Sequence, residues 1–187
     1  ISNNQHIDHG SIHYSWWDEN GQKQTADIAK MCPRDVRSKI CGRHISMVFQ
    51  DSMTSLNPTV TIGNQIIEGM LEHYKLTKEE AKARAIKLLE EVGIKNPEKR
   101  FKQYPHQLSG GMCQRVGIAI ALACDPDILI CDEPTTALDV TIQLKILNLI
   151  KKIQKEKQIS VVYITHDLGV VAKVADYVCV MYAGRII

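Results

Sequence analysis

The 187-residue sequence lacks long apolar runs, a signal peptide and an imbalance of charge. No run approaches the roughly 20 apolar residues that a membrane-spanning helix needs. Residues 1–6 show no secretory pattern. The formal net charge of +2 gives no broad basic field of the kind that indicates nucleic-acid binding. Without a membrane span or a secretory pattern, the chain is expected to be soluble and cytosolic. Its 44% hydrophobic residues are enough for one sizeable core.

The sequence also lacks paired cysteines. Its six cysteines show no C-x-x-C spacing, which argues against a disulfide framework and against a metal site. Cys131 and Cys179 fall inside apolar segments, where a free thiol behaves as a small hydrophobic side chain. We therefore expect free, buried thiols.

An acidic pair follows a short apolar run. The run 128–131 lies between Pro126 and Pro134, which predicts a strand buried on both faces of a parallel sheet. Asp132 and Glu133 then stand at its carboxyl end, where open α/β sheets bind ligands. In a nucleoside triphosphatase the first acid can hold Mg²⁺, and the second can orient and deprotonate water. The alternative is that both acids only cap the next helix.

Two other predicted strands end in polar residues. Gln50 follows the strand 44–49, and His166 follows the strand 159–164. With a further strand at 177–182, strands and helical patterns alternate, which predicts an α/β fold with a parallel sheet. A lone histidine at a strand end is more often a helix cap. This one, however, is expected to lie near the acidic pair, so we favour a role in binding phosphate.

A glycine pair stands before an apolar helical pattern at 116–124. Ser109 suits a helix N-cap, and Gly110 and Gly111 would let a ligand approach the free N–H groups of the first turn. This segment predicts an anion site. The alternative is an ordinary loop and cap.

The other segments predict how the chain is organised. Asn20-Gly21 indicates an antiparallel hairpin between 11–17 and 22–28. Helical patterns without strands run from 62 to 124, which predicts a helical lobe inserted into the sheet domain. We therefore expect residues 1–61 and 125–187 to form an ATPase core, and residues 62–124 to form the lobe.

Together these motifs resemble the ATP-binding subunit of ABC transporters. The resemblance covers nearly the whole chain, and it rests on Gln50, Leu108-Ser109-Gly110-Gly111-Met112-Cys113-Gln114-Arg115, the acidic pair, Ala137-Leu138-Asp139 and Thr165-His166-Asp167. Segments 49–58 and 135–140 look like the importer branch for oligopeptides, dipeptides and nickel. Segments 108–112 and 181–185 look like its D-type subunit. Met112 stands where many members carry Gln.

The resemblance implies a P-loop NTPase (RecA-like) fold that uses ATP and Mg²⁺. Glu133 would be the general base, and His166 would contact the γ-phosphate. Asp132 and Gln50 would hold the metal, and Gln50 would also touch the attacking water. ATP held by a partner subunit would be bound in trans by Ser109, Gly110, Gly111 and Met112, with Asp139 lining the same interface.

The resemblance also implies partners. These would be transmembrane permease subunits, a second ATP-binding subunit and, indirectly, an external solute-binding protein, with no nucleic acid. The chain would then lie at the cytoplasmic face of the membrane as a peripheral subunit.

The sequence departs from the family at the phosphate-binding loop. No G-x-x-x-x-G-K-[ST] pattern occurs, although such a loop supplies most of the grip on phosphate. In the family its strand would precede Ile1, so we expect a core fragment without the P-loop strand that is inactive by itself.

Two alternative functions stay open. The chain could be a non-hydrolysing interaction fragment. It could also belong to an ATPase of the chromosome-organising or repair type. That class requires long heptad segments between Gln50 and Leu108, and this sequence has none there.

Overall fold

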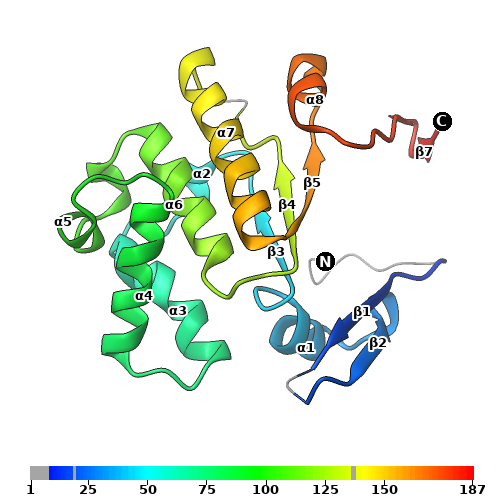
Figure 1. Ribbon diagram of the computed structural model, residues 1–187, viewed down its shortest axis with the longest axis horizontal. Coiled ribbons are helices and arrows are strands. Elements are labelled where there is room, and N and C mark those ends of the chain that lie inside the picture. The colour runs from blue at the N-terminus through cyan, green and yellow to red at the C-terminus, as the bar shows by residue number, and fades with distance from the viewer. Residues whose placement is uncertain (1–8, 19, 136–137) are drawn as a thin grey trace.

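The computed structural model describes residues 9–18, 20–135 and 138–187, with only the backbone of Ser52 and Met53 (Figure 1). Its strands fall into a parallel sheet and two antiparallel pairs. The strands are β1 (His13–Trp17), β2 (Lys23–Asp27), β3 (Ile45–Val48), β4 (Ile128–Asp132), β5 (Ser160–Ile164), β6 (Met181–Tyr182) and β7 (Arg185–Ile186).

The helices occupy the stretches between these strands. The α-helices are α1 (Pro33–Asp35), α2 (Ser52–Ser55), α3 (Ile62–His73), α4 (Lys78–Glu91), α5 (Pro97–Phe101), α6 (Gly110–Leu122), α7 (Val140–Lys157) and α8 (Leu168–Val174). Two 3₁₀ turns, η1 (Ile28–Lys30) and η3 (Pro105–Gln107), and a π-helical turn, η2 (Val36–Ile40), complete the set. None of the helices in the described part of the chain is long and apolar enough to cross a membrane.

The central sheet has the strand order β3-β4-β5, and all three strands are parallel. Val48 pairs with Cys131, and Asp132 pairs with Ile164, so the three carboxyl ends meet at one edge. The long segments between the strands carry helices, as parallel crossover connections require. The parallel sheet expected from the alternating pattern is therefore confirmed, and it brings together residues that lie far apart in the sequence.

One face of this sheet packs against helices. Leu129 and Cys131 of β4 are fully buried in a cluster that includes Ile146 and Ile150 of α7 and Val116 of α6. Figure 1 shows α7 in front of the sheet and the helices α3 to α6 to one side of it. The same hydrophobic cluster continues into the helical region, so sheet and helices share one core.

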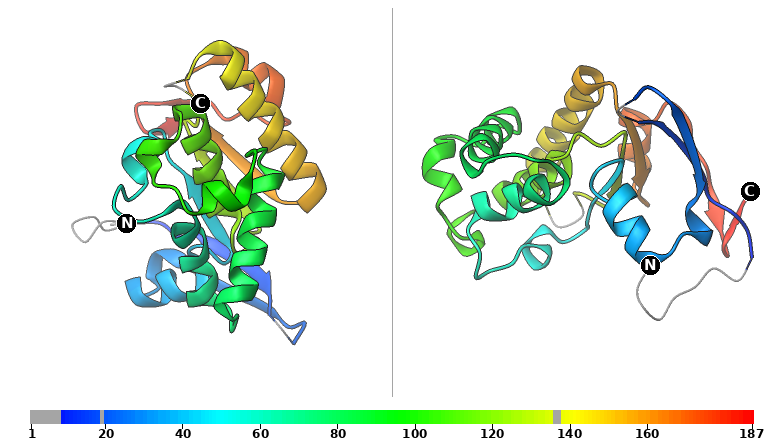
Figure 2. Two further views of the ribbon diagram at one scale, coloured as in Figure 1. Left: turned by 90° about the vertical axis from the view of Figure 1, so that its left-hand side faces the viewer. Right: turned by 90° about the horizontal axis from the view of Figure 1, so that it is seen from below.

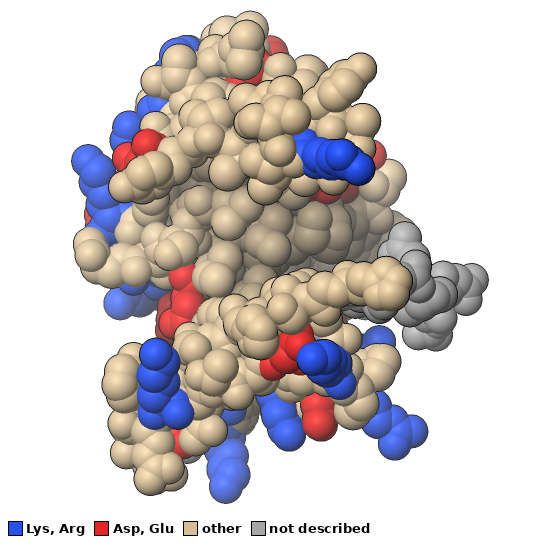
Figure 3. All heavy atoms as spheres, turned by 90° about the vertical axis from the view of Figure 1, so that its right-hand side faces the viewer, with Lys and Arg blue, Asp and Glu red and all other residues tan. Residues whose placement is uncertain are grey.

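The other face is much less covered. Burial alternates along β4, where Ile128 and Ile130 are half-buried, and on β5 Val162 and Ile164 are about half exposed. The prediction that 128–131 is buried on both faces is therefore wrong. The side chains of β4 and β5 opposite the Leu129 face are therefore partly accessible. Figure 3 views the molecule from the side of the C-terminal segment, where the middle is hollowed and carries few charged side chains.

The hairpin predicted around Asn20-Gly21 is confirmed. β1 and β2 pair in antiparallel register, with Trp16 opposite Gln24, and Gly21 has a positive φ of 71°. The hairpin lies beside the amino end of the central sheet, and Figure 2 shows it on the side of the sheet away from the helical region. Figure 3 shows Lys and Arg side chains gathered on this lower part of the molecule.

Helices α3 to α6 lie in segment 62–124, where the sequence predicted helices without strands. The capping box at the start of α4 is present, because Thr77 accepts the N–H of Glu80 and Glu80 accepts the N–H of Thr77. Ala81, Ala85 and Leu89 form the buried stripe of this helix. The proposed division into a core and a lobe at residues 62 and 124 stays a prediction.

Two predictions fail near the C-terminus. Residues 177–182 do not form a strand of the parallel sheet; only Met181–Tyr182 is extended, and it pairs with Arg185–Ile186. Cys179 is accordingly exposed, as are Cys32 and Cys41, whereas Cys113, Cys124 and Cys131 are buried. All six thiols are free, so the expectation of free thiols is confirmed, and that of burial holds for three of them.

Candidate functional site

Three strand ends place polar side chains around Glu133. Gln50 lies two residues beyond β3, Glu133 follows β4 directly, and His166 lies two residues beyond β5. Because the strands are parallel and in register, these residues converge at the carboxyl edge of the sheet, where ligands of open α/β sheets bind. The sequence predicted that His166 would lie near the acidic pair, and the structure confirms it. A place for Gln50 at this site was implied only by the family resemblance, and the structure brings Gln50 to Glu133 as well.

Both carboxylate oxygens of Glu133 make a hydrogen bond. The side-chain amide of Gln50 donates to Oε2 at 2.8 Å. His166 Nδ1 lies 2.8 Å from Oε1, and it donates that hydrogen bond when it carries the proton. The two partners approach from opposite neighbouring strands and hold the carboxylate in one orientation.

The backbone at Glu133 is strained. Its φ is +42°, in the left-handed region that side chains other than glycine enter only at a cost. The peptide N–H of Glu133 donates to the carbonyl oxygen of Ile164 at 2.9 Å, which extends the pairing of β4 and β5 by one residue. The side chain of Glu133 is 23% exposed and that of His166 is 74% exposed, so the cluster stays open to a ligand.

Asp132 is the last residue of β4 and stands next to this cluster. Mg²⁺ is usually held by one or two carboxylates together with substrate phosphates, and it favours hard oxygen donors. The carboxylate of Asp132 and the amide oxygen of Gln50 are donors of this kind, because the amide nitrogen of Gln50 faces Glu133. Within the described ranges no group of three or more His, Cys, Asp or Glu residues could hold a metal ion. Two oxygen donors of this kind suit an ion that substrate phosphates also coordinate.

The neighbouring thiol is unsuited to bind a metal. Cys131 is fully buried on the packed face of β4, and burial raises the pKa of its thiol to about 12. The protonated thiol is a poor ligand.

The glycine-rich segment begins α6 as expected. Ser109 occupies the N-cap position with φ −75° and ψ 159°, and its carbonyl accepts the N–H groups of Met112 and Cys113. Its hydroxyl makes no capping hydrogen bond to this helix. The first N–H groups of α6 are thus presented at a helix start, the usual position for anion binding. Met112 is half-buried and packs on the core.

Asp139 begins α7. Its Oδ1 accepts the N–H of Ile142 at 2.9 Å, so this carboxylate caps the helix that covers the sheet. Thr136 and Ala137 of the adjoining motif lie outside the described residues. A role of Asp139 at an interface stays a prediction.

One polar contact escaped the sequence reasoning. The Tyr14 hydroxyl donates to Asp127 Oδ2 at 2.6 Å, and His44 Nδ1 lies 2.7 Å from the same oxygen. The contact joins the hairpin to the starts of β3 and β4. Tyr14 lies 113 residues before Asp127 in the sequence, and His44 lies 83 residues before it. No local sequence pattern indicates a contact between residues so far apart.

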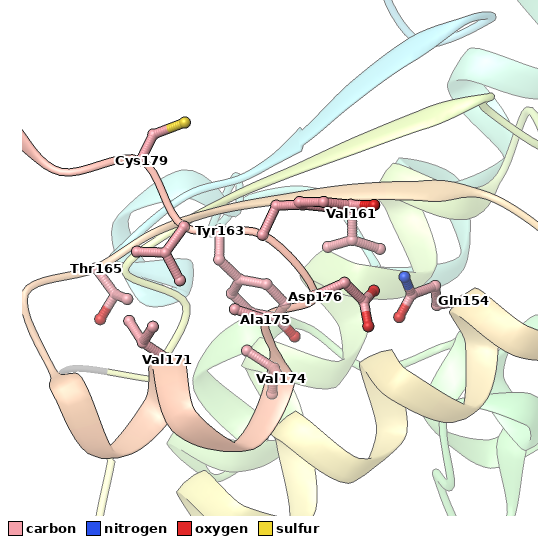
Figure 4. Close-up of a pocket in the computed structure, with 11 residues that line it drawn as sticks. Gln154, Val161, Tyr163, Thr165, Val171, Val174, Ala175, Asp176 and Cys179 are labelled. Carbon is pink, nitrogen blue, oxygen red and sulfur yellow. The ribbon is translucent and has the colours of Figure 1, made fainter. Parts of the chain in front are cut away.

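A cavity of about 230 Å³ lies away from Glu133, on the packed side of β5. Figure 4 shows Tyr163 of β5 between α8 and the segment that carries Asp176, with Gln154 of α7 beyond it. Thr165 lines this cavity, but Gln50, Glu133 and His166 do not. The candidate site is therefore the Gln50–Glu133–His166 cluster and not this cavity.

The comparison with protein families shows which family this chain belongs to. A model described as ABC transporter matches residues 1–136. The chain belongs to the ABC transporter family. The resemblance seen in the motifs is confirmed, and the α/β fold expected from it is confirmed as well.

The similar ABC transporter sequences are ATP-binding proteins of peptide transport. The chain is 57% identical over 159 residues to the dipeptide transport ATP-binding protein DppD of Bacillus subtilis (strain 168), covering 85% of this chain and 47% of that protein. It is 50% identical over its full length to the oligopeptide transport ATP-binding protein AmiE of Streptococcus pneumoniae, of which it covers 50%. The chain thus spans about half the length of the curated relatives that it matches.

Solved ABC structures share the fold. The ATP-binding cassette MJ0796, in a dimeric post-hydrolysis state bound to ADP and phosphate, matches with a TM-score of 0.68 and 30% identity, over 83% of this chain and 64% of that one. The cbiO1 protein of Clostridium perfringens, part of the transporter complex cbiONQ, matches with a TM-score of 0.72 and 30% identity, over 89% of this chain and 64% of that one.

Proposed function

We propose that this chain is part of an ATP-hydrolysing subunit that powers the import of peptides, or of nickel, through an ABC transporter. The observation that carries the proposal is the carboxylate of Glu133, held by Gln50 and His166 at the carboxyl edge of a parallel sheet. The similarity to dipeptide and oligopeptide transport proteins supports peptide as the cargo.

In the proposed reaction Glu133 accepts a proton from the attacking water. A general base must be fixed within hydrogen-bond reach of that water, and the two hydrogen bonds to Glu133 fix it. His166, two residues beyond β5, would contact the γ-phosphate. Gln50 connects the end of β3 to the same carboxylate, so a movement of the segment after β3 changes the position of the base.

Asp132 and Gln50 would hold Mg²⁺, which neutralises charge on the phosphates when it is bound. Ser109, Gly110, Gly111 and Met112 would face ATP on a partner subunit, with Asp139 at the same interface. The partners would be permease subunits in the membrane, a second ATP-binding subunit and an external solute-binding protein, and the chain would lie on the cytoplasmic face. The dimeric state reported for the cassette MJ0796 supports the second subunit.

One sequence observation favours a second candidate function. The chain has no G-x-x-x-x-G-K-[ST] pattern, so the usual phosphate grip is not encoded within these 187 residues. The chain by itself would then bind a permease or a sister subunit without hydrolysing ATP. Calorimetric titration of Mg-ATP into the chain separates the two candidates: saturable micromolar binding favours the first, and absence of heat favours the second.

The decisive experiment replaces Glu133 by Gln in the complete subunit assembled with its permease. We expect ATP turnover to fall by about 100-fold or more, because the amide cannot accept the proton, while ATP binding persists. Glu156→Gln, an exposed position on α7, is the matched control and should leave turnover unchanged. Unchanged turnover in Glu133→Gln would overturn the assignment of the base. Uptake of labelled peptide against labelled nickel by the same complex then identifies the cargo.

A further inference from the structure

The two glycines at the start of α6 have different surroundings within the chain. A Cβ added to Gly110 would meet nothing within 4 Å. A Cβ added to Gly111 would lie 2.9 Å from Cγ2 of Ile142, closer than packed carbon atoms approach. Gly111 is therefore in direct steric contact with α7, whereas Gly110 is not.

A physical constraint must account for the glycine at position 111. It lies inside a helix, where glycine is less favourable than alanine by roughly 0.5–1 kcal/mol. Its φ is not in the left-handed region, so the backbone conformation does not require glycine. The contact with Ile142 supplies the requirement, because only a residue without Cβ allows α6 and α7 to approach this closely.

Ile142 has little freedom to move aside. It is β-branched and stands in the first turn of α7, where a β-branched side chain has one strongly preferred χ1. Its N–H is held by Asp139 Oδ1, and its half-buried side chain packs on the hydrophobic core. The backbone and the side chain of Ile142 are thus both fixed.

The contact joins two segments that are far apart in the sequence. On one side is the α6 start, with Ser109 at the N-cap; on the other is the α7 start, with Asp139 at the N-cap. We propose that Ile142 is a positioning residue: its contact with Gly111 sets the spacing between the α6 start and the α7 start. This inference rests on the proposed function, in which the α6 start faces ATP of a partner subunit and the α7 start lies at the same interface.

The test uses variants of the complete subunit in its transporter. Gly111→Ala introduces the overlap, and Ile142→Leu removes it, because leucine has no branch at Cβ. Ile142→Val is the matched control, because valine keeps both γ-carbons and therefore the overlap. The double variant Gly110→Ala with Ile142→Leu tests whether Ile142→Leu restores ATP turnover only when the alanine is at position 111.

We expect Gly111→Ala to lower ATP turnover by about tenfold, as overpacking of a fixed contact predicts. Adding Ile142→Leu should restore turnover to within about threefold of the parent, while adding Ile142→Val should not restore it. Ile142→Leu should not restore turnover lost in Gly110→Ala. Equal turnover in Gly111→Ala with and without Ile142→Leu would overturn the inference. Gly111 would then be needed only for nucleotide binding and not for the spacing of the two helices.

Amide hydrogen exchange separates this inference from the proposed function, because it needs no ATP. Gly111→Ala should increase exchange at the starts of both α6 and α7, and Ile142→Leu should reverse the increase in both. If the complete subunit hydrolyses no ATP, the proposed function fails while this pattern of exchange still supports the spacing role. Increased exchange confined to α6, or none, would overturn it.

Discussion

His166 and Glu133 lie 33 residues apart in the sequence, yet Nδ1 of the first is 2.8 Å from Oε1 of the second. The pairing of β4 with β5 brings them together, and the N–H of Glu133 bonded to the carbonyl of Ile164 fixes the approach. A carboxylate held in this way, at an open edge of the sheet, has the position that a general base requires.

The strain at Glu133 predicts an unusual response to glycine. With φ at +42°, Glu133→Gly relieves a cost that Glu133→Ala retains, so we expect the glycine variant to have the higher free energy of unfolding by about 1 kcal/mol. Urea denaturation of the two variants measures the difference. At Lys145, inside α7, the order should reverse, with glycine less stable than alanine by about 1 kcal/mol. The same order at both positions would contradict the strain.

Removal of His166 should affect turnover far more than stability. His166→Ala deletes a hydrogen bond that orients Glu133, so we expect ATP turnover of the complete subunit to fall by about 10- to 100-fold. Because the side chain is 74% exposed, the free energy of unfolding should change by no more than about 0.5 kcal/mol. Steady-state kinetics and denaturation test both parts. His9→Ala, at another exposed histidine, should change neither quantity.

The hydroxyl of Tyr14 should stabilise the attachment of the hairpin. Burial, with the hydrogen bond to Asp127, raises the pKa of Tyr14. We expect Tyr14→Phe to lower the free energy of unfolding by about 1 kcal/mol, the usual net value of one hydrogen bond. Tryptophan fluorescence reports on the site directly, because both tryptophans of the chain lie in β1 and Trp16 stacks on Tyr14. Tyr182→Phe, at an exposed tyrosine, should leave the emission unchanged.

Asp167 should make stability depend on pH in the acid range. It caps α8 by accepting the N–H groups of Gly169 and Val170, and the hydrogen bond from Gly169 is the main cause that lowers its pKa. Its stabilisation is therefore fully present above the unfolded-chain pKa of about 3.9 and is lost as pH falls through the lower folded-state value. The stability difference between the parent and Asp167→Asn, measured by urea denaturation, should be constant from neutral pH down to about pH 5 and shrink below about pH 4. A difference that grows on acidification would contradict this.

Local patterns predicted many elements of the fold. The Asn20-Gly21 turn and the helical pattern that begins at 116 depend on residues within a few positions of each other, and both are present. The failures came where burial depends on distant partners. The apolar segment 177–182 resembles a strand, but it is extended only at Met181–Tyr182, which pairs with Arg185–Ile186 and not with the central sheet.

For the candidate site, the sequence by itself determined which residues are present: two acids after an apolar run, a glutamine and a histidine after two others, and glycines before a helix. The tertiary structure alone decided that Gln50 and His166 both bind Glu133, that Glu133 adopts a left-handed backbone, and that Gly111 contacts Ile142. Composition and periodicity act over a few residues, whereas these contacts arise from strand register and helix packing. A one-residue shift of register would separate the same side chains.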